Sequence, residues 1–264
     1  MAERNERHRG IFLHARDTAR GDRIATFLSE EGIFSLFLFG GPRSSLKSAA
    51  MPYHCADVEI YHDRRTEFLK LTGVEIVETF DAIHGSFGQM QAAAGAAEFI
   101  IRTSAFGGDS AHAFRMMLSF LHEVAEMDET LASWALDAFL WDGLEPLGIA
   151  PDTNHCEQCG RPLFGLQASA ALYARGDRGF LCAACGEMRI HNGFPQTAIY
   201  RLAPQALECL RSLGEFHFSQ AAERLASSPA RDSLGSIIEL LAEQAAEGPL
   251  QALLLLHDRR ILDR

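Results

Sequence analysis

The stretch CEQCGRPLFGLQASAALYARGDRGFLCAACGE, residues 156–187, holds four of the six cysteines of this chain. The cysteines form two Cys-x-x-Cys pairs, Cys156 with Cys159 and Cys182 with Cys185. Two such turns bring four sulfurs together, and four thiolates are a tetrahedral ligand set that suits structural zinc. Because sulfur fills every position, no site stays open for water, and the spacing predicts structural zinc rather than catalytic zinc.

The residues around these cysteines predict a small zinc-ribbon-like module. Gly160 and Gly186 each follow the second cysteine of a pair, where a tight knuckle needs a permissive backbone. Two apolar runs around ARGDRG (174–179) predict a hairpin. Two redox pairs or four unligated thiols are the alternative, and His155 and His191 are substitute ligands. The remaining two cysteines are interpreted as small buried hydrophobic residues: Cys55 and Cys209.

Composition places the chain among soluble globular proteins. Of 264 residues, 47% are hydrophobic and 22% are charged, which is enough to bury a real core. The first residues, MAERNERHRGIFLHAR, lack the apolar segment of a secretory signal. Apolar runs such as ALLLLH (252–257) are too short to cross a bilayer. We therefore expect a cytoplasmic protein that has no membrane partner. In this reducing compartment, paired cysteines indicate a metal site rather than disulfides.

The first 80 residues contain five candidate strands separated by glycine-containing breaks. Each has strand length, β-branched or aromatic enrichment and partial period-two alternation. The candidates span residues 10–16, 24–30, 33–39, 56–62 and 68–80. Five strands in so short a segment predict a small closed or partly open barrel, and a mixed α+β domain is the alternative.

The rest of the chain is mainly helical outside the cysteine-rich insert. Apolar residues recur at three- and four-residue steps in six segments. These segments are 86–104, 109–127, 128–148, 203–214, 232–248 and 249–264. Pro204 and Pro249 are suited to the first turn of a helix. The predicted fold class is therefore an α+β multidomain protein.

No catalytic constellation is recognisable in the sequence. It lacks the GxxxxGK[ST], GxGxxG, HExxH and GxSxG signatures, and its eleven histidines are scattered. The sequence therefore predicts a protein that is not an enzyme.

A basic loop is the best candidate for a ligand-binding segment. In FGGPRSSLKSAAMPY (39–53) the only charges are Arg43 and Lys47, beside glycines and serines that suit phosphate oxygens. A barrel with such a loop commonly holds single-stranded nucleic acid, although a solvated loop is the alternative. The net charge of −11 opposes indiscriminate binding to nucleic acid. Salt, however, screens charges that lie more than about 8 Å away, so a local basic patch determines whether nucleic acid binds. Further arginines nearby are Arg16, Arg20, Arg23, Arg64 and Arg65.

Three stretches, in this order, resemble the RecO family of bacterial recombination mediators. They are RGIFLHARDTARGDRIATFLSEEGIFSLFLFGGPRSSLKSAAMPYHCADVEIY (9–61), LDAFLWDGLEPLGIAPDTNHCEQCGRPL (136–163) and GFLCAACG (179–186). The resemblance implies an N-terminal OB-fold β-barrel that binds DNA, an α-helical domain, and a four-cysteine zinc module inserted into it. The corresponding boundaries are 1–82 for the barrel, 83–152 and 195–264 for the helical domain, and 153–194 for the zinc module.

The resemblance also implies a function. Such proteins bind single- and double-stranded DNA, anneal strands, contact the acidic C-terminal tail of SSB, and act with RecR to load RecA in recombinational repair. A bacterial, nucleoid-associated location in the cytoplasm follows. Carried over by position, the expected DNA-binding residues are Arg43, Lys47, Arg16, Arg20 and Arg23. The expected zinc ligands are Cys156, Cys159, Cys182 and Cys185.

One feature departs from the family pattern. Residues 86–264 carry a net charge of −9, whereas DNA annealing and docking of an acidic tail both require basic surface. Either distant arginines such as Arg102, Arg115 and Arg211 assemble a basic face, or one activity is weakened. The alternative function is therefore a zinc-ribbon adaptor that binds proteins and has little or no DNA affinity.

Overall fold

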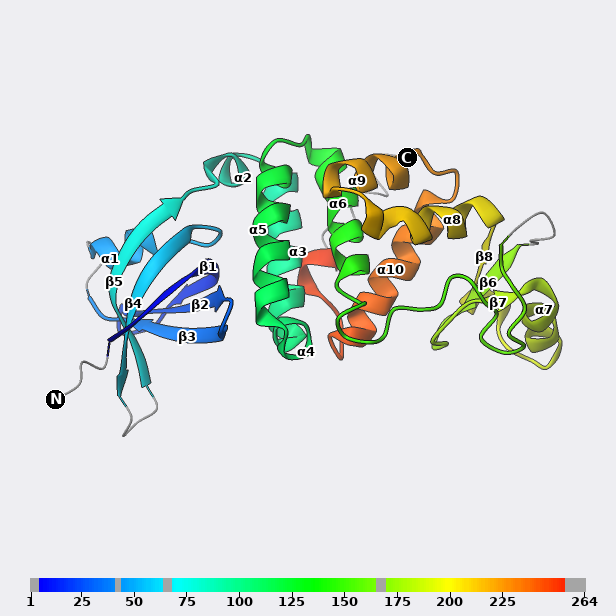
Figure 1. The fold of residues 1–264 in the computed structure, drawn as a ribbon, viewed down its shortest axis with the longest axis horizontal. Coiled ribbons are helices and arrows are strands. Elements are labelled where there is room, and N and C mark those ends of the chain that lie inside the picture. Colours follow the sequence, from blue (N-terminus) through cyan, green and yellow to red (C-terminus); the bar gives the residue numbers. More distant parts are fainter. Residues whose placement is uncertain (1–4, 41–43, 64–67, 165–169, 255–264) are drawn as a thin grey trace. The chain divides into compact units, whose positions relative to one another are not determined.

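The computed structural model describes residues 5–40, 44–63, 68–164 and 170–254 (Figure 1). The chain divides into two compact units, Met1–Met127 and Asp128–Arg264. None of the helices in the described ranges has the length and apolar character that crossing a bilayer requires.

The first unit begins with the predicted barrel, which is closed. Its strands are β1 (Asn5–Asp17), β2 (Arg23–Ser29), β3 (Gly32–Leu38), β4 (Cys55–Asp63) and β5 (Phe68–Glu78). They follow the order β1-β2-β3-β5-β4, and the parallel pair of β3 with β5 joins the two halves of the sheet. The inward residues form one core: Phe12, Ala25, Phe27, Leu36, Leu38, Ala50, Ala56, Val58, Ile60 and Leu71.

The segment predicted as a basic loop contains a short helix, α1 (Ser45–Ala49). It forms because Leu46 packs against the barrel core and Ala50 is fully buried, so this part of the segment has an apolar side to bury. Three further predicted residues of the basic surface lie outside the described residues: Arg43, Arg64 and Arg65.

Four helices complete the first unit: α2 (Asp81–Gly85), α3 (Phe87–Arg102), α4 (Ser104–Gly108) and α5 (Ser110–Ala125). The two long ones confirm the helices predicted over 86–104 and 109–127. Side-chain caps explain where they begin. The Ser86 side chain accepts a hydrogen bond from the Gln89 N–H, and Asp109 accepts one from His112. Between them the backbone of α4 is left-handed at Ala105–Gly107.

The helices of the second unit are α6 (Glu129–Asp142), α7 (Ala183–His191), α8 (Pro204–Ser212), α9 (Phe218–Ser227) and α10 (Arg231–Ala245). Three of them, α6, α8 and α10, confirm predicted helices, and Pro204 lies in the first turn of α8. The helix predicted over 249–264 falls largely outside the described residues, which end at 254.

Helix α9 was not predicted from the sequence. Its ten residues are marginal for a helix in isolation, so tertiary packing supplies most of its stability. Phe218, Ala222 and Leu225 are buried, and the Phe218 ring lies 5.8 Å from that of Phe139 in α6. The side chains that stabilise α9 are therefore about 80 residues away in sequence, beyond the reach of local periodicity.

The cysteine-rich insert folds around a three-stranded sheet in the order β7-β6-β8. The strands are β6 (Ala171–Ala174), β7 (Leu181–Cys182) and β8 (Ile199–Leu202). Ala171 pairs with Cys182 and Leu172 with Leu181 in antiparallel register, which confirms the predicted hairpin. Figure 1 shows α7 beside this sheet, where it follows directly from β7.

Candidate functional site

Four cysteine sulfurs meet in the insert at the geometry of a metal centre. The Sγ atoms of Cys156, Cys159, Cys182 and Cys185 all lie within 4.8 Å of one another. Four thiolates about 2.3 Å from a central ion lie about 3.8 Å apart in a tetrahedron. The measured separation of the Cys159 and Cys182 sulfurs is 3.8 Å. The residues therefore fit a four-coordinate metal ion.

The first cysteine pair sits on a tight knuckle. The Cys156 carbonyl accepts a hydrogen bond from the Gly160 N–H at 2.8 Å, while the Cys156 N–H donates to the Arg161 carbonyl at 2.8 Å. Gly160 has φ of +69°, in the left-handed region that favours glycine. This confirms the reason predicted for the first glycine.

The second pair has a different backbone, which corrects the prediction for its glycine. Cys182 is the N-cap of α7, and Cys185 and Gly186 lie inside the helix. Gly186 is needed for space and not for a left-handed turn. A Cβ atom there would approach the Leu172 side chain of β6 to 2.6 Å, closer than real contacts allow.

The first knuckle favours ionisation of one sulfur. Burial opposes ionisation of Cys156, but hydrogen bonds from the backbone of Cys182, Cys159 and Gln158 together lower its pKa to about 7. Burial, followed by hydrogen bonds among the neighbouring thiols, raises the pKa of Cys185. N–H groups directed at sulfur also stabilise metal-bound thiolates, so the knuckle suits a cation.

The histidines named as substitute ligands do not join this group in the described structure. Nδ1 of His155 is instead 3.0 Å from a carboxylate oxygen of Asp152. None of the six cysteines, all of which lie in the described residues, forms a disulfide. Cys55 and Cys209 are buried, which raises the pKa of both thiols, and this confirms their interpretation as buried hydrophobic residues.

Arg211 of α8 supports the first knuckle. Its guanidinium donates to the carbonyls of Thr153 and Leu163 and lies 5.9 Å from the centre of the Phe164 ring. Arg115 forms an ion pair with Glu30 at 3.7 Å. Arg211 and Arg115, which were considered for a basic helical face, therefore already have structural partners.

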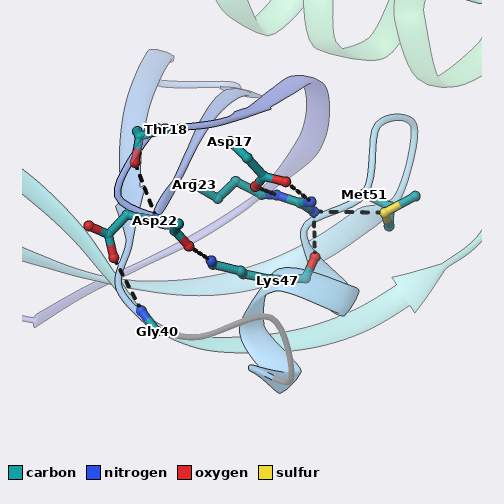
Figure 2. Close-up of polar contacts among 8 residues, drawn as sticks. Asp17, Thr18, Asp22, Arg23, Gly40, Lys47 and Met51 are labelled. Carbon is teal, nitrogen blue, oxygen red and sulfur yellow. Dashed lines mark hydrogen bonds and ion pairs between the residues drawn. The ribbon is translucent and has the colours of Figure 1, made fainter.

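On the barrel, two of the predicted DNA-binding residues form an internal latch (Figure 2). Lys47 is only 6% exposed, and its Nζ donates to the Gly21 carbonyl. Arg23 donates to the Lys47 carbonyl at 2.8 Å and to the Asp17 carboxylate at 2.8 and 3.2 Å. The Asp22 side chain accepts from the Gly40 N–H at 3.4 Å. Together these bonds tie the β1–β2 turn to α1 and to the end of β3.

The latch corrects the expectation that Lys47 presents its charge on a solvated loop. The side chain is buried because α1 turns it toward the carbonyl of Gly21, which replaces water as its partner. By contrast, Arg16 and Arg20 are exposed. Within the described part of the chain, neither forms an ion pair or side-chain hydrogen bond. The charges of these two residues are therefore accessible from solvent.

Sequence reasoning missed an aromatic group on the outer side of the barrel. The rings of Phe37, Phe39 and Phe68 lie 4.6–5.8 Å apart, and Lys70 Nζ is 5.3 Å from the Phe39 ring centre. The alternation in IFSLFLFG (33–40) places Phe37 and Phe39 on the side opposite Leu36 and Leu38. That pattern is the signal that could have identified an aromatic outer surface.

Two family models match the chain in succession. The model described as Recombination protein O N terminal matches residues 1–80, and Recombination protein O C terminal matches residues 85–252. The chain belongs to the RecO family. A curated relative from Heliobacterium modesticaldum (strain ATCC 51547 / Ice1), named DNA repair protein RecO, is 26% identical over 210 residues. The match covers 78% of this chain and 72% of the relative.

Proposed function

We propose that this RecO-family protein is a DNA-binding recombination mediator in DNA repair. It binds single- and double-stranded DNA, anneals complementary strands and catalyses no reaction of its own. The observation that carries the proposal is the match of both family models, which together span the barrel and the helical part. The exposed Arg16 and Arg20 support DNA contact by the barrel, because exposed cations suit phosphates.

The proposed partners are those that a mediator requires. RecR acts with the protein to load RecA, and the acidic tail of SSB brings it to coated single strands in the bacterial cytoplasm, at the nucleoid. The relative's name, DNA repair protein RecO, supports the repair pathway. The basic residues proposed for DNA are Arg16, Arg20 and Arg43, with Arg23 and Lys47 holding the segments that carry them.

The metal proposed for the four-cysteine site is zinc, in a structural role. Four thiolates complete a tetrahedron and leave no position for a substrate. The sulfur spacing and the N–H groups that lower the pKa of Cys156 support a bound dication. Zinc would hold the two knuckles together beside a sheet whose strands β6 and β7 are only four and two residues long.

A second candidate function is a zinc-ribbon adaptor that binds only proteins. The net charge of −11 favours it, because long-range repulsion opposes encounter with a polyanion. The two functions differ in their response to salt. Binding through several phosphate contacts weakens steeply as salt rises, whereas an adaptor has no DNA affinity to titrate.

The deciding experiment is fluorescence anisotropy of the full chain with labelled single-stranded and duplex DNA of one sequence, at low and then at moderate salt. The mediator function predicts binding to both, with affinity that falls strongly as salt rises. An Arg16→Ala, Arg20→Ala double variant should flatten the slope of log K against log salt by about 1.4 for a single strand. Absence of binding at low salt would favour the adaptor.

A further inference from the structure

The barrel register places five residues in one row across all five strands. Arg16 of β1 pairs with Ile24 of β2, and Ile24 pairs with Phe37 of β3. Phe37 pairs with Lys70 of β5, and Lys70 pairs with Tyr61 of β4. Directly paired residues project from the same face of a sheet. The row therefore belongs to one surface of the barrel.

Burial shows that this surface is the outer one. Leu36 and Leu38, which flank Phe37, are fully buried, and so is Leu71, which follows Lys70. Because successive side chains alternate between faces, Phe37 and Lys70 point away from the core. Lys70 and Arg16 are exposed.

The outer surface carries an aromatic group that solvent reaches. The Phe39 side chain is 46% exposed, and its ring centre lies 5.4 Å from that of Phe37 and 5.8 Å from that of Phe68. The rings of Phe37 and Phe68 are 4.6 Å apart. Lys70 Nζ lies 5.3 Å from the Phe39 ring centre. The exposed Phe39 ring is thus packed against two other rings, and the Lys70 ammonium group lies over it.

Two cations of this surface are available to the phosphates of a polyanion. Across the described residues, neither Lys70 nor Arg16 forms an ion pair. The other outward residues of β2, β3 and β5 near the row are uncharged: Thr26, Ser35 and Thr72. Acidic side chains of this face lie on β4: Glu59, and Asp63, which pairs directly with Phe68. The aromatic centre is therefore flanked by cations on β1 and β5 and by the Asp63 carboxylate on β4.

We propose that this surface, defined as Arg16, Phe37, Phe39, Phe68 and Lys70, is a stacking platform for the unpaired bases of single-stranded DNA. The inference rests on the proposed DNA-binding function and names the substrate form that this surface takes. A base stacks on Phe39, while Lys70 and Arg16 contact flanking phosphates. Every base has a flat face, so the platform is indifferent to sequence. A duplex has no free base face to offer and contacts only the cations.

The test compares Phe39→Ala with a matched control, Phe87→Ala, in the full chain. Phe87 lies in α3 and is 44% exposed, so both variants remove an equally accessible ring. Stacking on an aromatic side chain is worth about 5- to 150-fold in affinity for each base. Phe39→Ala should lose at least about fivefold for a single strand and leave duplex affinity unchanged. Phe87→Ala should leave both unchanged.

Two further measurements separate stacking from a fold defect. Phe39→Trp should restore single-strand affinity, and its fluorescence should be quenched by the oligonucleotide. An abasic oligonucleotide should bind wild type and Phe39→Ala equally, because it carries phosphates without bases. Lys70→Ala should instead flatten the salt slope by about 0.7, the effect of one phosphate contact.

The outcomes separate this inference from the proposed function. If wild type binds neither DNA form, the proposed function fails, and the platform fails with it. If wild type binds both forms and Phe39→Ala binds the single strand normally, only the platform is wrong. Equal losses for single strand and duplex would also overturn it, because stacking requires unpaired bases.

Discussion

The Arg23 guanidinium donates a hydrogen bond to the backbone carbonyl of Lys47 at 2.8 Å, while the Lys47 ammonium group donates to the carbonyl of Gly21. Each cation thus satisfies a carbonyl in the neighbouring segment. The pair joins the β1–β2 turn, which carries Arg20, to α1. We conclude that these two basic residues organise the barrel surface, whereas Arg16 and Arg20 face the solvent.

The latch predicts that Lys47→Met lowers stability. The substitution keeps the aliphatic stem and leaves the Gly21 carbonyl without its charged donor, which costs about 1.5–3 kcal/mol in the free energy of unfolding. Urea unfolding of the two proteins measures this difference. Because Lys47 is buried, the salt slope of DNA binding should stay unchanged. A slope reduced by about 0.7 would show instead that Lys47 reaches a phosphate.

The four-cysteine site predicts that one exposed ligand controls metal content. Cys159 is exposed, so Cys159→Ser removes a ligand and leaves no cavity in the core. Zinc content, measured by atomic emission, should fall from about one ion per chain, and the insert should become sensitive to protease. The control is Cys209→Ser, a buried thiol outside the site, which should retain the metal. A metal-free Cys159→Ser protein with wild-type melting would contradict a structural role.

Substitution of alanine for Gly186 and for Gly160 should lower stability for different physical reasons. Gly186→Ala drives a methyl group into Leu172, which is 1% exposed, and overpacking of this kind costs about 1–3 kcal/mol. Thermal melting should show the loss, and adding Leu172→Ala should partly restore stability by making room. In Gly160→Ala the penalty arises from the left-handed backbone, so the same second substitution should not rescue it. Rescue of both variants would refute the steric explanation.

Asp142, the last residue of α6, predicts a pH dependence of stability. Burial, and then the charge of Glu145, raise its pKa to about 7, whereas an unfolded aspartate has a pKa of about 3.9. Between these values the folded state holds the extra proton, so the free energy of unfolding falls as pH rises from about 4 to about 7.

Asp142→Asn removes that titration. Above about pH 7 the variant should be more stable than wild type, by on the order of 1–4 kcal/mol, and the advantage should shrink toward pH 4. Urea unfolding at about pH 8 and about pH 5 measures both values. An advantage of equal size at the two pH values would show that the carboxyl does not titrate in this range.

Local patterns in the sequence were sufficient for the features whose determinants lie close together in the chain. The spacing of Cys156 and Cys159, and of Cys182 and Cys185, predicted a metal-binding knuckle, because two residues between cysteines form a single turn. Period-two and period-3.6 patterns likewise predicted the five barrel strands and five of the helices in the described residues: α3, α5, α6, α8 and α10.

The tertiary structure decided the features whose determinants are distant. The Lys47 ammonium group donates its hydrogen bond to a carbonyl in the turn before β2, and α9 is stabilised by α6, so residues adjacent in sequence do not determine either outcome. Gly186 is required because Leu172 approaches it from another strand. The row from Arg16 to Tyr61 exists only once β3 pairs with β5 and closes the barrel. Residue type and spacing thus determined the elements and the metal ligands, whereas strand register and packing decided which basic and aromatic side chains reach the surface.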